Sequence, residues 1–244
     1  MKRRSFLKQS GVGAIAGGAT LATPVFVQNA PSIDWWMASS FPRTLDTLFG
    51  AGEVFCDYVR QATNGKFDIR ALPAGDAVPG LQVMAAVSEN KVQCGHTFSL
   101  YYYEQDPAFC FDAALPFGLN ARQMNAWMQE GDGLTLTRDM FAAHHIVNFP
   151  MGNTGVQMGG WFRKEIKNLA DLKGLKMRTA GLGGAVLARL MVEPQQLEAA
   201  EIAKALGKGG LDAAEFVGPY DDEKLGLNKA ATFYYSPGWW EGGA

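Results

Sequence analysis

The sequence predicts an α/β fold with a mainly parallel sheet, and three observations support that class. Short stretches that are apolar, or that alternate apolar and polar residues, are typical of strands and recur through residues 33–217. Stretches with apolar residues every three or four positions are typical of helices and separate the strands. Glycine, proline and asparagine gather between the two kinds of stretch, and this alternation favours parallel strands covered by helices.

The first part of the chain contains three expected strands and two expected helices. The strands are expected at 33–38, 67–71 and 92–98. One helix is expected from Leu45 to Val59, with Asn64-Gly65 as the stop signal, and a second at 81–88. The order strand, helix, strand, helix, strand implies parallel pairing.

The middle of the chain combines aromatic residues with a helical stretch. Three tyrosines at 101–103 follow the third strand, and we expect two to pack beneath a loop and one to face a ligand. Residues 120–143 are predicted to be helical with a break at 131–133, and 144–150 to form a strand. A glycine-containing turn at 152–155 is expected to be the first crossing between domains.

The second part of the chain alternates in the same way. The expected strands are at 155–163, 175–180 and 211–217. The expected helices are a short one from Asn168 to Gly174, one at 183–191 and one at 199–206.

Arg178 stands where the carboxyl end of a strand is expected, directly before the glycines of a strand-to-helix turn. That edge of an open α/β sheet is where ligands bind. A guanidinium keeps its charge and presents a planar fork of donors, so it needs a carboxylate or phosphate opposite it. The pattern leaves two interpretations open: an ion pair with an acid of the protein itself, or a contact with an anionic ligand.

Glu215 is the second unusual residue, because it lies within the apolar stretch LDAAEFV. An ionised carboxylate in such surroundings costs too much free energy unless it is paired or bound to a cation. Pairing with Arg178 is the simplest structural interpretation. The three cysteines, Cys56, Cys94 and Cys110, show no zinc-binding spacing. We expect buried free thiols, and a disulfide between Cys94 and Cys110 is the alternative that an oxidising compartment would permit.

Residues 1–30 are typical of a twin-arginine signal peptide. Arg3 and Arg4 precede Ser-Phe-Leu-Lys, and a weakly apolar run rich in glycine and alanine follows at 11–22. This run is too short and too rich in glycine to span a membrane, so we expect a periplasmic protein. Without the basic residues of this segment the net charge falls from −2 to −6, which argues against nucleic acid as a partner.

Three segments together resemble one family of transport proteins. WFRKEIKNLADLKGLKMRTAG is followed by DAAEFVGPYDDEKLGL and then by YYSPGWWEGG. With them the chain resembles the extracytoplasmic solute receptors of TRAP (tripartite ATP-independent periplasmic) transporters, in the branch that binds 2-oxo and hydroxy monocarboxylates. The similarity runs from about Trp35 to Glu241. It implies a two-domain periplasmic binding protein-like fold with a ligand cleft between the domains.

The resemblance also implies a division of the chain. Residues 31–152 would form the first α/β domain, 153–238 the second, and 239–244 the start of the return crossing to the first. Members of the family continue well beyond WWEGG, so we expect the C-terminal part to be missing. A chain that ends at Ala244 would then expose apolar surface and unpaired strand edges, and we expect it to be weakly stable.

A ligand site follows from the same resemblance. Arg178 would bind the carboxylate of the ligand through two N–H groups, and Tyr101 and Trp240 would line the site. A metal cation, sodium or alternatively calcium, would bridge the protein and the ligand through oxygen donors alone. Its protein ligands would be Gln157, Glu215, the backbone carbonyl of Phe216, and Glu241. Phe216 stands where family members often have tryptophan, which changes the shape of the pocket wall.

We therefore expect a receptor, not an enzyme, that delivers a small acid such as pyruvate or lactate to the membrane permease. The alternative is an exported enzyme that binds its acid through Arg178 and uses Glu215 as a base. The sequence favours the receptor, because it contains no nucleophile elbow, catalytic histidine set or cofactor fingerprint. It leaves open whether the receptor is a monomer or a homodimer.

Overall fold

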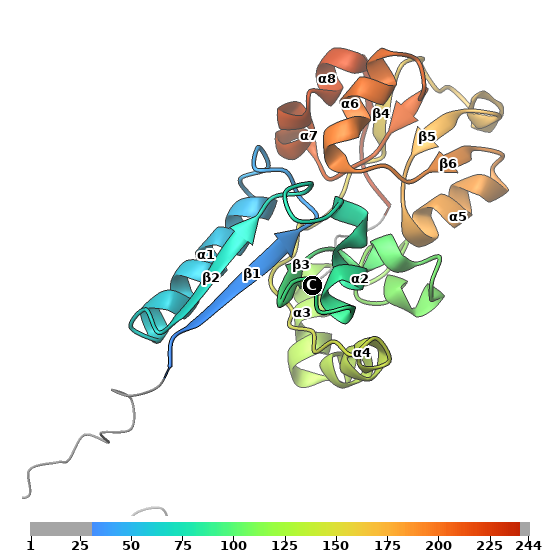
Figure 1. The fold of residues 1–244 in the computed structure, drawn as a ribbon. Helices are drawn as coiled ribbons and strands as arrows, with labels where there is room; N and C mark the ends of the chain where they lie inside the picture. Colours follow the sequence, from blue (N-terminus) through green and yellow to red (C-terminus); the bar gives the residue numbers. More distant parts are fainter. Residues whose placement is uncertain (1–30, 240–244) are drawn as a thin grey trace, which may run out of the picture. The chain divides into compact units, whose positions relative to one another are not determined.

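The computed structural model describes residues 31–239, and its residues from Ile33 onward belong to one compact α/β unit with two sheets (Figure 1). The expected signal peptide at 1–30 lies outside the described residues. Within the described part of the chain, no helix is long and apolar enough to cross a membrane. Cys56, Cys94 and Cys110 are free thiols, and Cys94 is half-buried.

The first sheet has three parallel strands in the order β2-β1-β3. Its strands are β1 (Ile33–Ser39), β2 (Phe67–Leu72) and β3 (Cys94–His96). Its helices are α1 (Leu48–Ala62) and α2 (Val83–Ser88), and Figure 1 shows α1 running along β1 and β2. The stop signal after α1 acts as expected, because Asn64 and Gly65 both adopt positive φ angles, at 51° and 76°. The expected parallel pairing is confirmed.

The middle of the chain is built from short helices. Short 3-10 helices are found at Ser99–Tyr102 and Pro107–Cys110, and α3 (Ala121–Glu130) and α4 (Gly133–Ala142) follow. Asn120 and Gln123 form a capping box at the start of α3, and the predicted break at 131–133 is present. The tyrosines at 101–103 therefore lie at a 3-10 helix and not at a strand end.

The predicted strand at 144–150 is wrong. His145 adopts a left-handed φ of 59°, which interrupts an extended conformation. Val147 and Phe149 are exposed and do not pack into a sheet. An apolar run alone therefore did not make a strand here, because no described strand pairs with it.

Asp112 is buried between these short helices, and its carboxylate accepts a hydrogen bond from the Ser99 hydroxyl. Burial raises the pKa of Asp112 to about 6, from an ordinary value of 3.8, and the Ser99 bond offsets part of this. The folded state therefore holds this proton more tightly than the unfolded state. The resulting stability is fully present below pH 3.8 and is lost as the pH rises through about 6.

The Asp112→Asn variant tests this linkage. We expect lowering the pH from 7 to 5 to stabilise the natural protein relative to this variant by about 1 kcal/mol. Urea denaturation at each pH measures the difference. Asp76→Asn at an exposed site is the matched control, and an equal pH response of all three proteins would contradict the assignment.

The second sheet has five strands in the order β6-β5-β7-β4-β8. The strands are β4 (Gly160–Phe162), β5 (Lys176–Arg178), β6 (Glu193–Gln195), β7 (Ala213–Ala214) and β8 (Phe233–Tyr235). The helices are α5 (Gly181–Arg189), α6 (Ala199–Gly207), α7 (Pro219–Leu225) and α8 (Leu227–Ala230). β5 is parallel to both of its neighbours, whereas β4 is antiparallel to both β7 and β8.

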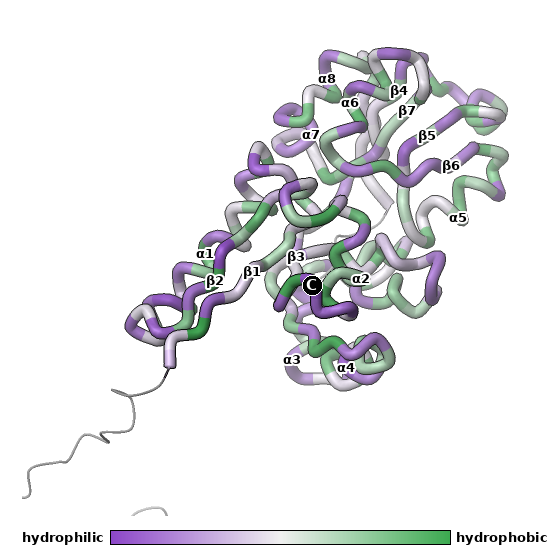
Figure 2. The backbone as a smooth tube through the Cα atoms, viewed as in Figure 1, coloured by the Kyte–Doolittle hydropathy of each residue, from purple (hydrophilic) through white to green (hydrophobic). Residues whose placement is uncertain are grey.

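Several boundaries in this half differ from the prediction. The strand expected at 155–163 begins only at Gly160, and the one expected at 211–217 is reduced to Ala213–Ala214. Gln157 and Glu215 therefore lie beside strands and not within them. The elements β6, α7, α8 and β8 were not predicted. Figure 2 shows α7, PYDDEKL, as a hydrophilic segment typical of a surface, yet Asp221 and Asp222 on it are buried.

One large hydrophobic cluster joins residues from both parts of the chain. It includes Phe41, Phe49, Phe109, Ile202, Leu206 and Leu227, each no more than 1% exposed. Because the loops that follow β3 and β7 both pack against this cluster, side chains distant in the sequence meet beside it.

Candidate functional site

A small pocket lies where the segment after β3 meets the ends of β5 and β7. Its cavity volume is about 20 Å³. One water molecule requires roughly 10–15 Å³ on this scale, so the space suits a very small ligand. The lining residues are Phe98, Leu100, Tyr101, Ala114, Gln157, Arg178, Ala180, Gly183, Glu215 and Phe216. Four predicted site residues are polar members of this lining.

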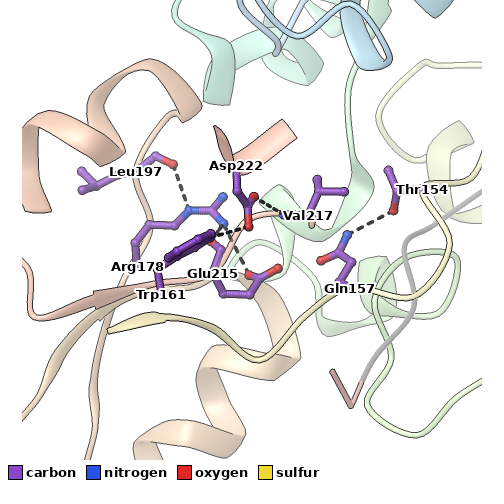
Figure 3. Close-up of polar contacts among 8 residues, drawn as sticks. All are labelled: Thr154, Gln157, Trp161, Arg178, Leu197, Glu215, Val217 and Asp222. Atoms are coloured by element: carbon purple, nitrogen blue, oxygen red, sulfur yellow. Dashed lines mark hydrogen bonds and ion pairs between the residues drawn. The ribbon is translucent and has the colours of Figure 1, made fainter. Parts of the chain in front are cut away.

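Arg178 is the last residue of β5, and its side chain is almost entirely buried, at 3% exposed. Its Nη1 donates to the backbone carbonyl of Glu215 at 2.5 Å, and its Nε donates to the carbonyl of Leu197 at 3.4 Å (Figure 3). The guanidinium carbon lies 5.1 Å from the centre of the Phe216 ring. These contacts hold the guanidinium plane in place at the pocket wall.

Glu215 provides the negative charge beside Arg178. Its Oε2 lies 3.5 Å from Nη1 of Arg178, and both side chains are at most 6% exposed. The ion pair that the sequence suggested is therefore present, but this distance is long for a charge-assisted hydrogen bond. Glu215 directly follows β7, and its N–H donates to the carbonyl of Arg178 at 3.0 Å. The position directly after β7 thus places the Glu215 side chain beside the last residue of β5.

Tyr101, Gln157 and Phe216 complete the predicted part of the site. Burial raises the pKa of Tyr101 to about 12, and the nearby Arg178 opposes this shift. Gln157 donates its amide N–H to the Thr154 hydroxyl at 3.2 Å. Its amide oxygen lies on the opposite side, toward Glu215 (Figure 3). The predicted residues Trp240 and Glu241 lie outside the described residues.

The pocket offers only oxygen donors to a cation. Glu215 has a carboxylate, Gln157 has an amide oxygen, and Phe216 also lines the pocket. Across residues 31–239 there is no group of three or more His, Cys, Asp or Glu side chains that could hold a metal. A single carboxylate with neutral oxygens fits a hard cation such as sodium or calcium and does not fit zinc.

Asp222 is a supporting residue that the sequence analysis missed. It is 1% exposed, and its two carboxylate oxygens accept separate hydrogen bonds, from Val217 N–H at 3.1 Å and from the Trp161 indole at 2.9 Å. Burial raises its pKa to about 6. Because Val217 follows Phe216 directly, Asp222 fixes the turn that carries Glu215 and Phe216 (Figure 3). The sequence does not reveal this role, because the charged residues of α7 are typical of an exposed helix.

The segment at the end of the described residues passes very close to Gln157. A Cβ atom added at Gly238 would lie 1.4 Å from the backbone oxygen of Gln157, far inside any allowed contact. We expect Gly238→Ala to displace this segment and to lower the free energy of unfolding by about 2–3 kcal/mol. Chemical denaturation measures the loss. Gly152→Ala is the control, because a Cβ there meets nothing within 4 Å, and equal stability of the two variants would contradict the expected contact.

Comparisons with known proteins agree on one family. Residues 38–242 match the model of bacterial extracellular solute-binding proteins, family 7. The chain is 50% identical over 247 residues to a monocarboxylate 2-oxoacid-binding periplasmic protein of Nostoc sp. (strain PCC 7120), which covers 100% of this chain and 68% of that protein.

Solved structures show the same relationship. A TRAP transporter solute-binding protein of Bordetella bronchiseptica RB50, with calcium and picolinate in its active site, is 53% identical with a TM-score of 0.86. The match covers 88% of this chain and 64% of that one. A TRAP periplasmic solute-binding protein of Pseudoalteromonas atlantica T6c, with bound sodium and pyruvate, is 37% identical with a TM-score of 0.83, over 86% and 64% of the two chains. The chain thus spans somewhat less than two thirds of these solved relatives.

Proposed function

The chain belongs to the bacterial extracellular solute-binding proteins of family 7, and from this premise we propose that it is the solute receptor of a TRAP transporter. Its ligand would be a small monocarboxylate, a 2-oxo acid such as pyruvate or a hydroxy acid such as lactate. The observation that carries this proposal is the buried guanidinium of Arg178 on the wall of a small pocket. A carboxylate is the partner that suits such a group.

The charges of the pocket explain why a cation would be needed. Arg178 and Glu215 together carry no net charge, so a bound carboxylate would leave one uncompensated negative charge in a buried site. A hard cation held by Glu215, Gln157 and the carbonyl of Phe216, with Glu241 as a further ligand, would remove that charge. Sodium fits this balance when Glu241 contributes a neutral oxygen, whereas a Glu241 carboxylate would add a second negative charge, which calcium would balance. Relatives whose structures contain sodium with pyruvate, or calcium with picolinate, support the assignment.

The proposed receptor works by closing around its ligand. Residues 31–152 and 153–238 would act as two domains, each with one of the two sheets, with Tyr101 and Trp240 among the residues that cover the ligand. Closure excludes water and strengthens the charged contacts of the site. Export by the twin-arginine route would place the receptor in the periplasm, where the closed form would meet the permease subunits.

Calorimetric titration tests this function directly. The protein is titrated with pyruvate and with lactate, in buffer with sodium, with calcium, and with neither. We expect one-to-one binding that requires a cation and leaves the acid unchanged when the mixture is analysed afterwards. Conversion of the acid would support the exported enzyme instead, and no binding by the folded protein would overturn the monocarboxylate assignment.

A further inference from the structure

Ala114 has an unusual backbone conformation for its residue type. Its φ angle is 55°, in the left-handed region that favours glycine. The other non-glycine residues with positive φ in the described range 31–239 are Asn64, Asn90, Phe117, His145 and Met191. Of these six residues only Ala114 lines the pocket that contains Arg178 and Glu215.

Packing on either side of Ala114 holds this conformation in place. Asp112 is bonded to Ser99, and Ala113 is only 2% exposed. Beyond Ala114, the N–H of Phe117 donates to the carbonyl of Trp239 at 2.8 Å. The backbone is therefore fixed at both ends of the segment, and a glycine would fit it with less strain than alanine.

A glycine at position 114 would relieve this strain at the cost of one methyl group. The presence of alanine there, on a pocket wall, therefore points to a role for its side chain. We propose that Ala114 is a specificity-determining residue whose methyl group limits the length of the acid that the pocket accepts. This inference rests on the proposed function as a monocarboxylate receptor. It goes beyond that function by identifying the side chain that selects among such acids.

Two other apolar residues of the lining, Phe98 and Leu100, have less freedom to change the size of the pocket. Phe98 packs edge to face against Phe41 and Tyr101, at ring-centre distances of 5.0 and 5.9 Å. Leu100 lies over Gly181 at the start of α5, where an added Cβ would meet it at 3.4 Å. Both walls are held by neighbours, whereas Ala114 is a half-buried residue beside the core, and Ala114→Gly removes only one methyl group from the wall.

The test compares Ala114→Gly with the natural protein, using pyruvate and its one-carbon-longer homologue 2-oxobutanoate in calorimetric titrations. We expect the variant to shift the ratio of the two affinities about 10-fold toward 2-oxobutanoate, because one methylene group in an apolar pocket is worth at least this much. Relief of strain should also raise the melting temperature by about 2–4 °C.

Met191→Gly is the matched control, because Met191 also has a positive φ, of 65°, but is 56% exposed and lies outside the pocket lining. It should raise the melting temperature in the same way and leave the ratio of affinities unchanged. A second variant, Ala114→Asn, keeps a residue type that tolerates positive φ but fills the pocket. We expect it to fold and to lose pyruvate affinity by at least about 10-fold.

The outcomes separate the two proposals. If the natural protein binds pyruvate but Ala114→Gly leaves the ratio unchanged, the specificity role is wrong and the receptor function stands. The same conclusion follows if Ala114→Asn binds pyruvate as tightly as the natural protein. If the natural protein binds neither 2-oxo acids nor hydroxy acids, the proposed function fails and the specificity role fails with it.

Discussion

Replacing Arg178 by alanine is expected to reduce the affinity for pyruvate by about 1000-fold, or about 4 kcal/mol. The guanidinium is 3% exposed and is held by the carbonyls of Glu215 and Leu197, so it is already oriented before a ligand arrives. A preorganised fork loses little entropy when it binds a carboxylate, and the low dielectric of the pocket strengthens the contact. No other cationic side chain lines this pocket within the described part of the chain.

Two further variants separate charge from geometry at this position. Arg178→Lys keeps the positive charge but replaces the planar guanidinium by a compact ammonium group that cannot bind a carboxylate through two parallel N–H groups in one plane, so we expect an intermediate loss of affinity. Lys176→Ala removes a cation from the same strand at an exposed position and should leave the affinity unchanged. Circular dichroism confirms folding of each variant before titration. Retention of full affinity by folded Arg178→Ala would place the ligand elsewhere.

Replacing Glu215 by glutamine is expected to abolish the dependence of ligand binding on a cation. In the natural protein the pair Arg178 and Glu215 is neutral, so the ligand carboxylate brings an excess negative charge into the buried site. Without the charge of Glu215, the ligand carboxylate itself neutralises Arg178, and no cation is required when Glu241 contributes a neutral oxygen. We expect removal of sodium and calcium to weaken pyruvate binding about 10- to 100-fold in the natural protein and to have no effect on the variant.

Asp221→Asn is the control for this experiment. It makes the same change from acid to amide at another buried carboxyl group, which bonds to Thr47 and lies outside the pocket lining. This variant should keep the cation dependence of the natural protein. A Glu215→Gln protein whose pyruvate affinity still rises with added sodium or calcium would show that the cation is held by other groups.

Some of the candidate site could be inferred from the sequence because the signals are local. Arg178 precedes the glycines of the β5 to α5 turn, and that order alone places it at the carboxyl edge of a sheet. Glu215 is conspicuous because a charged residue among apolar neighbours requires compensation. The chemistry of a guanidinium and a carboxylate in apolar surroundings does not depend on knowing the exact strand boundaries. For this reason the pair was correct even though the strand expected at 211–217 is only two residues long.

Other features depended on contacts that no local pattern contains. The run at 144–150 has the apolar composition of a strand but finds no partner, so it stays irregular. Asp222 lies in the charged run DDEK of α7, which is typical of a surface, yet it is buried and accepts hydrogen bonds from the Trp161 indole and the Val217 N–H. The roles of Ala114, Phe98 and Leu100 as pocket walls are likewise invisible in the sequence.

The sequence by itself determined the α/β class, the turns that end the helices, and the two charged residues, Arg178 and Glu215, whose charges must be compensated by each other or by a ligand. These depend on periodicity, on turn chemistry and on the cost of a buried charge, all of which act between near neighbours. Only the tertiary structure decided that Ala114 and Arg178 line the same cavity of about 20 Å³. That arrangement results from long-range packing against one shared core, in which residues more than sixty positions apart in the chain come together.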